Sequence, residues 1–247
     1  MKLVKKVLAG VAMAAAMATS AQAAIINVGG VMWDPSSPFD FSGTSASVVQ
    51  NINTTTGELT GYGNVTILNN TIQSTFCPGC ELTFNFSGYT PISGNPVPGI
   101  GGGGTQIQYT GGLFNLYVDN SPETNAGTTM TAANTSDGNL WLTLVGHANA
   151  FGITLTGTNF FPILLQGGGA LDVTGGLAAS NLDTNTMPDG ADLLFSATFT
   201  RFPGNSPLNA TGSATFDGNS VPEPGSLALL GLGLVGLAAA RRRQQAK

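Results

Sequence analysis

Short runs of alternating apolar and polar residues recur along the interior of the chain, and they are separated by Gly, Asn, Pro and Asp. In one such run Leu82, Phe84 and Phe86 alternate with polar residues, which is the period of a half-buried strand. No interior stretch keeps a period of 3.6 residues, except for a short turn near Leu177–Asn181. Ten or more strand-like runs therefore predict an all-β protein, an antiparallel β-sandwich or jelly-roll-like domain.

The N-terminus has the three parts of a secretory signal peptide. Three lysines within the first six residues precede the apolar segment Val7–Ala18, and Ala21-Gln22-Ala23 then offers a small-x-small cleavage site. The alternative, a permanent N-terminal anchor helix, is disfavoured by the short apolar segment and by that site. We therefore expect residues 1–23 to be a signal peptide and the protein to be exported.

The C-terminus also has three ordered parts. Val221–Ser226 contains a Pro-Glu-Pro spacer, Leu227–Ala240 is apolar, and an arginine cluster follows. Proline fixes φ and lacks an N–H, so the spacer should be extended. The apolar segment would span about 21 Å as a helix, against a hydrocarbon core of roughly 30 Å. Such a short transmembrane helix suits temporary residence in a membrane.

This tail resembles the PEP-CTERM sorting signal of exported bacterial proteins. The matching residues of the motif and the cluster are Pro222, Glu223, Pro224, Arg241, Arg242 and Arg243. The resemblance implies that an exosortase-type membrane protease recognises the motif, cuts near it and releases or transfers the product. The membrane would hold the chain through residues 227–240 only before processing, and the destination would be the cell surface or the extracellular matrix. Residues 221–247 then form the sorting signal, and residues 24–220 form one domain.

The charge of residues 24–220 excludes several functions. Arg201 is the only basic residue there, and twelve carboxylates oppose it. Such a surface repels phosphate backbones, so we expect no binding of nucleic acid. It also lacks a pair of basic residues to hold a phosphorylated or carboxylate substrate.

Cys77-Pro78-Gly79-Cys80 is the only cysteine motif. Pro-Gly at its centre favours a type II turn, which brings the two outer Cα atoms within about 7 Å. Disulfides need roughly 4.4–6.8 Å, so an oxidising compartment should join Cys77 and Cys80. Redox or metal chemistry is the alternative, but strand-like residues flank the motif on both sides and a redox pair usually needs a helix N-terminus.

Oxygen ligands are concentrated at Asp183, Asn185, Asp189 and Asp192. Ca²⁺ prefers such ligands, so this loop is a weak calcium candidate. An Asx-rich turn is the favoured interpretation, because Met187-Pro188 interrupts the spacing. We therefore expect no cofactor, with calcium as the open alternative.

His147 is the only histidine, and a Ser/His/Asp triad would have to use it. No nucleophile-elbow motif accompanies it, and a histidine at a strand end with a backbone partner is the favoured interpretation. We therefore expect a protein without enzymatic activity.

Several interior stretches are similar to flocculation-associated PEP-CTERM proteins: Phe76–Phe84, Leu171–Gly176, Leu182–Thr186 and Gly190–Leu193. This resemblance implies a non-enzymatic protein of the extracellular polysaccharide matrix that helps cells to form flocs or biofilm. Two alternatives remain. A carbohydrate-binding module should expose Trp33, Trp141 or tyrosines in a shallow groove, and a secreted glycoside hydrolase needs paired carboxylates.

Overall fold

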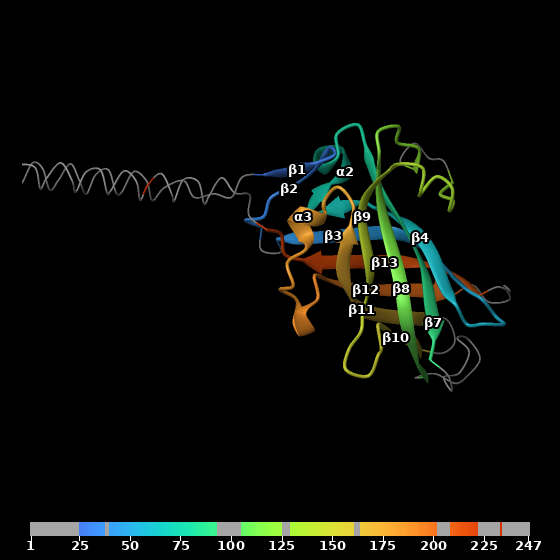
Figure 1. Ribbon diagram of the computed structural model, residues 1–247. Coiled ribbons are helices and arrows are strands. Elements are labelled where there is room, and N and C mark those ends of the chain that lie inside the picture. Colours follow the sequence, from blue (N-terminus) through green and yellow to red (C-terminus); the bar gives the residue numbers. More distant parts are fainter. Residues whose placement is uncertain are drawn as a thin grey trace, which may run out of the picture. The chain divides into compact units, whose positions relative to one another are not determined.

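Figure 1 presents a computed structural model of the chain, which describes residues 25–37, 40–92, 105–124, 129–160, 164–201, 208–221 and Gly233. Ile25–Val221 forms one compact unit. The expected signal peptide, the six sorting residues and the apolar segment apart from Gly233 lie outside the described residues. Within the described part of the chain, no helix has the length and apolar character needed to cross a membrane.

Antiparallel strands make up most of this unit, so the all-β prediction is confirmed. The strands are β1 (Ile26–Val28), β2 (Val31–Trp33), β3 (Phe41–Ile52), β4 (Leu59–Val65), β5 (Ile67–Leu68), β6 (Thr71–Ile72), β7 (Glu81–Pro91), β8 (Thr105–Asp119), β9 (Asn139–His147), β10 (Leu155–Phe160), β11 (Leu164–Gly175), β12 (Leu193–Arg201) and β13 (Leu208–Gly218). The helical elements are α2 (Gln73–Phe76), α3 (Ala179–Leu182) and η2 (Pro188–Gly190). The turn expected near Leu177–Asn181 is thus realised as α3.

The main sheet closes on itself. Its strands follow one another as β3-β4-β7-β8, then β10-β11-β12-β13, and β13 also pairs with β3, from Leu208↔Ile52 to Gly218↔Phe41. In Figure 1, β11, β12 and β13 cross β7 and β8 at a steep angle. The molecule therefore has the two packed faces of the expected sandwich, and the structure adds that both belong to one closed sheet with meander connectivity.

Strands β9 and β10 share one position between β8 and β11. β10 pairs with Thr105–Tyr109 of β8, whereas β9 pairs with Leu113–Val118 of the same strand. Gly111 and Gly112 separate the two pairings, and both have positive φ, of 76° and 101°. A Cβ at Gly112 would lie 2.3 Å from the ring of Tyr89, so the barrel can change partner here only where the side chain is absent.

The interior is filled by the inward residues of the alternating strands. Leu82, Phe84 and Phe86 are all buried, as predicted. Thr83, expected on the outer face, is buried as well, because the neighbouring strands cover that part of β7. The central contacts are among aromatic rings, with centroids 4.9 Å apart for Phe114–Phe195 and 5.0 Å apart for Phe86–Phe114.

A second aromatic cluster closes the end of the barrel where β3 begins. Trp33 lies 5.7 Å from Phe41 and 5.9 Å from Trp141 between ring centroids. Trp141 reaches this cluster through a β-bulge: Tyr117 pairs with Leu140 but Leu116 pairs with Leu142. The alternation of Leu140 with Leu142 and Leu144 therefore breaks at this bulge, since Trp141 is buried and Leu140 is 42% exposed.

Candidate functional site

The last described residues before the sorting tail are fixed to the barrel. Ser220 donates two hydrogen bonds to the carboxylate of Asp40, one from its backbone N–H and one from its hydroxyl, at 2.6 Å. Trp33 Nε1 donates to Ser220 Oγ at 3.3 Å, and Val221 N–H donates to Asn181 O at 2.7 Å. The chain is therefore held by side chain and backbone up to the residue that precedes the Pro-Glu-Pro spacer.

Cys77 and Cys80 form the expected disulfide, with their Cα atoms 5.1 Å apart. Gly79 has a φ of 77°, which a type II turn requires, and Cys80 N–H donates to Cys77 O. One detail of the prediction is wrong, because residues 73–76 form helix α2 rather than a strand. Its last residue, Phe76, is buried in the core, and Gln73 Nε2 donates to Cys80 O at 2.9 Å.

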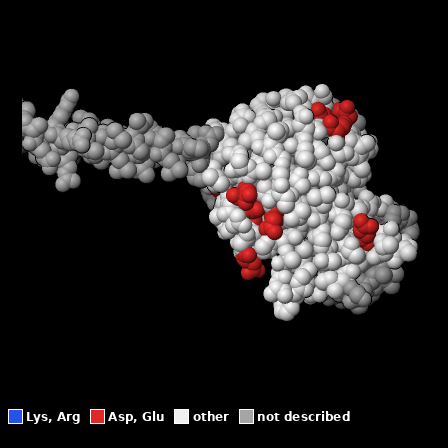
Figure 2. Space-filling model, viewed as in Figure 1, with Lys and Arg blue, Asp and Glu red and all other residues white. Residues whose placement is uncertain are grey.

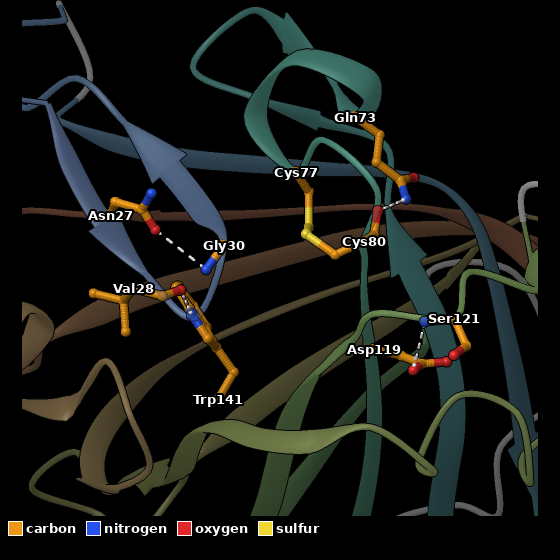
Figure 3. The surroundings of a disulfide bond; sticks show 9 residues. All are labelled: Asn27, Val28, Gly30, Gln73, Cys77, Cys80, Asp119, Ser121 and Trp141. Atoms are coloured by element: carbon orange, nitrogen blue, oxygen red, sulfur yellow. Dashed lines mark hydrogen bonds between the residues drawn. A yellow bond between two sulfur atoms is a disulfide. The ribbon is translucent and has the colours of Figure 1, made fainter.

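The disulfide supports the β1–β2 hairpin (Figure 3). Gly30, with a φ of 98°, sits so close that a Cβ would lie 3.3 Å from Cys80 Sγ. On the other side of the hairpin, Trp141 Nε1 donates to Val28 O at 2.9 Å. Both cysteines are buried. Their bond therefore stiffens the closed end of the barrel, which is a structural role.

The four calcium candidates do not point to a common centre. The carboxylate of Asp192 is buried and accepts backbone N–H groups of Val173, Thr184 and Asn185 at 2.6–2.7 Å. Asp183 Oδ1 accepts the amide of Asn185, and Asp189 is exposed in η2 with a φ of 61°. Over the described ranges, no group of three or more His, Cys, Asp or Glu side chains is placed to hold a metal ion. The arrangement is the Asx-rich turn that the sequence favoured.

His147 has a carboxylate partner instead of the expected backbone partner. Its Nδ1 lies 2.7 Å from Asp172 Oδ1, on the outer face of neighbouring strands β9 and β11. Such a pair resembles two members of a catalytic triad. Within the described residues, the hydrogen bond to Asp172 is the one contact found for the His147 ring, and no hydroxyl group bonds its other nitrogen as the serine of a triad would.

Trp33 and Trp141 are not available as sugar-stacking platforms. They are 3% and 0% exposed and belong to the aromatic cluster at the closed end. The surface is instead dominated by uncharged residues, and Figure 2 shows carboxylates at separate places with no Lys or Arg in that view. The two tryptophans therefore do not supply the exposed groove that would favour a carbohydrate-binding module.

A hollow lined by hydroxyl groups lies on the outer face of the barrel. Its volume is about 460 Å³, and we name it the hydroxyl groove; the side chains and glycines that line it are Thr44, Thr156, Thr158, Gln166, Gly167, Gly168, Ser196, Ala197, Thr198, Ser213, Ala214 and Thr215. None of these residues is charged.

The register of the strands orders these groups in two rows across the sheet. One row runs Thr158, Gln166, Thr198, Ser213 through directly paired positions of β10, β11, β12 and β13. The other runs Thr156, Gly168, Ser196, Thr215 and ends at Thr44 of β3. Because adjacent strands lie about 4.8 Å apart, hydrogen-bonding groups repeat at that spacing along each row. Ser196 Oγ and Thr215 Oγ1 are 2.7 Å apart and hydrogen-bond one another.

The described residues define a closed antiparallel β domain with an uncharged groove and a firmly held C-terminal junction. The family model described as the PEP-CTERM protein-sorting motif matches residues 220–243, so the matched segment begins at the junction residue Ser220. The chain carries a PEP-CTERM protein-sorting motif, which supports export, transient anchoring in a membrane and processing by exosortase, a membrane protein. Searches of curated proteins and of solved structures find no match to the chain.

Sequence reasoning missed two parts of this site. Asp40 and Ser220 are 180 positions apart, and nothing local to either residue indicates the contact. The hydroxyl groove had a usable signal, since Thr156 and Thr158 alternate with small residues in β10, as Ser196 and Thr198 do in β12. Alternation of small polar residues with apolar residues marks the outer face of a strand, but only the pairing of strands shows that the two faces are continuous.

Proposed function

We propose that the protein is a non-enzymatic component of the cell surface or extracellular matrix that takes part in exopolysaccharide-associated aggregation, as in flocs or biofilm. The sorting motif at residues 220–243 supports the destination in this proposal, since it indicates export and processing by exosortase. The similarity of Phe76–Phe84 and Leu171–Gly176 to flocculation-associated proteins supports the same destination.

The hydroxyl groove supplies the surface for a polysaccharide. The hydroxyl groups of the groove donate and accept hydrogen bonds, as sugar hydroxyl groups do. Because the groove is uncharged, a neutral polysaccharide can bind there without the cost of removing water from a charged side chain. Two parallel rows of such groups suit an extended polymer better than a compact ligand. This makes carbohydrate binding a second candidate function, carried by hydroxyl rows rather than by stacked tryptophans.

A glycoside hydrolase is less well supported by the same groove. Retaining and inverting hydrolysis both need two carboxyl groups on either side of the scissile bond. Among the described residues that line the hydroxyl groove there is no Asp or Glu. We therefore assign the groove to holding a polysaccharide and not to cutting it.

Deletion of Val221–Lys247 tests the proposed sorting and role. The strain that produces the truncated protein should mislocalise it and flocculate less than the parent strain, measured by cell fractionation and settling rate. Unchanged flocculation with a mislocalised protein would overturn the role in aggregation. Unchanged localisation would overturn the role of the tail.

The hydroxyl groove is tested with a triple variant, Thr156→Val, Thr158→Val and Thr198→Val. Valine keeps the shape of threonine and its strand preference but removes the hydroxyl group. Retention on exopolysaccharide from the same cells should fall at least about tenfold, as expected for the loss of three net hydrogen bonds. Thr60→Val, on β4 outside the groove, is the matched control and should bind normally. Equal retention of the triple variant would rule out this surface.

A further inference from the structure

The second row of hydroxyl groups continues beyond the groove. Thr44 of β3 pairs directly with Ile67 of β5, and Ile67 pairs with Ile72 of β6. Directly paired residues lie on the same face of a sheet, so both isoleucines share the face of the hydroxyl groups. We name the whole series the long row: Thr156, Gly168, Ser196, Thr215, Thr44, Ile67 and Ile72. At a strand spacing of about 4.8 Å, the long row extends over about 29 Å.

The two isoleucines form an exposed apolar pair at one end of the long row. Ile67 is 38% exposed and Ile72 is 62% exposed, whereas Leu68, on the other face of β5, is buried. Ile72 directly precedes α2, which lies above β3, β13, β12 and β11 in Figure 1. Beyond the hydroxyl groups, the same face of the sheet therefore offers apolar side chains to a bound molecule.

The loop between β9 and β10 stands at the opposite end of the long row. Ala170 of β11 pairs with His147, the last residue of β9, and Gly169 pairs with Leu155, the first residue of β10. The residues between these two strands therefore leave the sheet between adjacent positions of β11. Leu155 directly precedes Thr156, so the loop borders the first residue of the row. In Figure 1 this loop is yellow and stands clear of the strands, below β10 and β11.

The loop presents one aromatic ring to solvent on a well-ordered support. Phe151 is 84% exposed. Asn149 Oδ1 accepts the N–H groups of Phe151 and Ile153 at 2.9 and 3.1 Å, and Asn149 N–H donates to Ile153 O at 3.0 Å. Thr154 then donates its N–H and its hydroxyl to Tyr109 O. Because these bonds already hold the loop, a ligand that packs on Phe151 would lose little free energy in ordering it.

The charge of the domain favours a neutral ligand over a second copy of the chain. Residues 24–220 contain twelve carboxylates and one arginine, so two copies repel each other. A chain of pyranose sugars meets no such repulsion. The edges of each sugar ring carry hydroxyl groups, which can hydrogen-bond the threonines and serines of the row. The C–H groups on its faces can pack on phenylalanine and isoleucine side chains.

We propose that a neutral pyranose polysaccharide lies across the strands along the long row, with one sugar ring packed on Phe151 and another on the Ile67–Ile72 pair. This inference rests on the proposed binding of polysaccharide in the hydroxyl groove. It adds the direction of the bound chain, the apolar contact at each end and the length of the bound segment. A fragment much shorter than the row can reach only one of the two ends.

Tryptophan reporters at the two ends test this path. Phe151→Trp and Ile72→Trp each add an exposed indole, whereas Trp33 and Trp141 are buried and give a background that the parent protein measures. Soluble exopolysaccharide from the same cells is the probe. We expect a saturable blue shift of the added emission, and protection from acrylamide quenching, at both positions. Leu177→Trp, at an exposed position after β11, is the matched control and should not respond.

Truncation measures how much the two ends contribute to binding. Phe151→Ala with Ile72→Ala should lower retention on immobilised exopolysaccharide about tenfold, through the loss of two apolar contacts. Leu177→Ala is the control and should be retained as the parent is. Equal retention of the double variant would overturn the path, and so would a fluorescence response at only one end or at Leu177→Trp. A response that depends on protein concentration without polysaccharide would indicate contact between copies and would also overturn it.

Failure of this path is distinguishable from failure of the proposed function. If the parent protein is not retained on exopolysaccharide, or if the triple threonine variant is retained equally, the hydroxyl groove does not bind the polymer and both proposals are wrong. If the parent is retained and the triple threonine variant is not, the groove binds the polymer. Silent reporters at Phe151→Trp and Ile72→Trp would then overturn only the path.

Discussion

Ser220 and Asp40 are joined by two hydrogen bonds although 180 positions separate them. The pair connects the segment that leads into β3 with the segment that follows β13, the two strands whose pairing closes the barrel. The two hydrogen bonds therefore hold together the segments next to the strand pair that closes the sheet, and they lie immediately before the sorting tail.

Removal of the Ser220 hydroxyl group should weaken the contact between these two segments. Ser220→Ala deletes the hydroxyl donor and leaves the carboxylate of Asp40 and the indole N–H of Trp33 each short of one partner. We expect a loss of about 1–3 kcal/mol in the free energy of unfolding, measured in urea. Hydrogen exchange at the Val221 amide should become faster. Ser36→Ala, whose hydroxyl bonds the exposed Asp34, is the control and should change little. Equal effects of the two changes would contradict the assignment.

Reduction of the Cys77–Cys80 disulfide should destabilise the domain without unfolding it. The bond closes a very small loop, so the chain-entropy model gives a loss of only about 2 kcal/mol. The β1–β2 hairpin, which packs on Cys80 through Gly30, should gain the most mobility. Urea unfolding with and without reductant measures the change. The double variant Cys77→Ser with Cys80→Ser should be insensitive to reductant, and complete unfolding on reduction would show that the bond does more than stiffen the turn.

Alanine substitutions at Gly61 and at Gly175 should have different effects on stability, because Gly61 is closely packed and Gly175 is not. A Cβ at Gly61 would lie 2.3 Å from both Phe86 Cζ and Val49 O, whereas a Cβ at Gly175 would meet nothing within 4 Å. Gly61→Ala should therefore cost about 1–3 kcal/mol through overpacking. Gly175→Ala should remain within about 0.5 kcal/mol of the parent. Thermal unfolding compares the two, and a tolerated Gly61→Ala would mean that β4 can move away from β3 and β7.

Alkaline pH should destabilise the barrel through Tyr89 and Tyr109. Burial raises the pKa of both, whereas in the unfolded chain they ionise near the ordinary value of about 10. The unfolded state therefore binds fewer protons above that pH, so this part of the stability is complete below pH 10 and is lost as the pH rises further. Urea unfolding between pH 8 and 11 measures the loss. Tyr89→Phe with Tyr109→Phe should flatten the curve, and an unchanged slope would show that other groups cause it.

The parts of the fold that depend on local sequence could be predicted from it. Alternation at Leu82, Phe84 and Phe86 gave a strand with the correct inner face, and Pro78-Gly79 gave the turn that joins the cysteines. Both depend on residues within one or two turns of chain, where spacing alone decides which side chains share a face.

The remainder depends on partners that are distant in sequence. Closure through β13 and β3 leaves no local mark, and the bulge that carries Trp141 inward reverses an alternation that pointed Leu140 to the core. The same holds for the sites. Neither the pairing of Asp40 with Ser220 nor the two rows of the hydroxyl groove follow from residue types, because each depends on how strands far apart in the sequence pair.

Closure by the last strand also sets an order of events during synthesis and export. The edges of β3 and β12 stay unpaired until Leu208–Gly218 arrives, and the matched sorting segment begins two residues later, at Ser220. Contacts across so long a separation form slowly, since loop closure precedes any gain. The barrel can therefore close only after β13 has been synthesised, and the sorting segment follows that strand directly. A chain that stops short of β13 would present two bare strand edges and would be prone to aggregate.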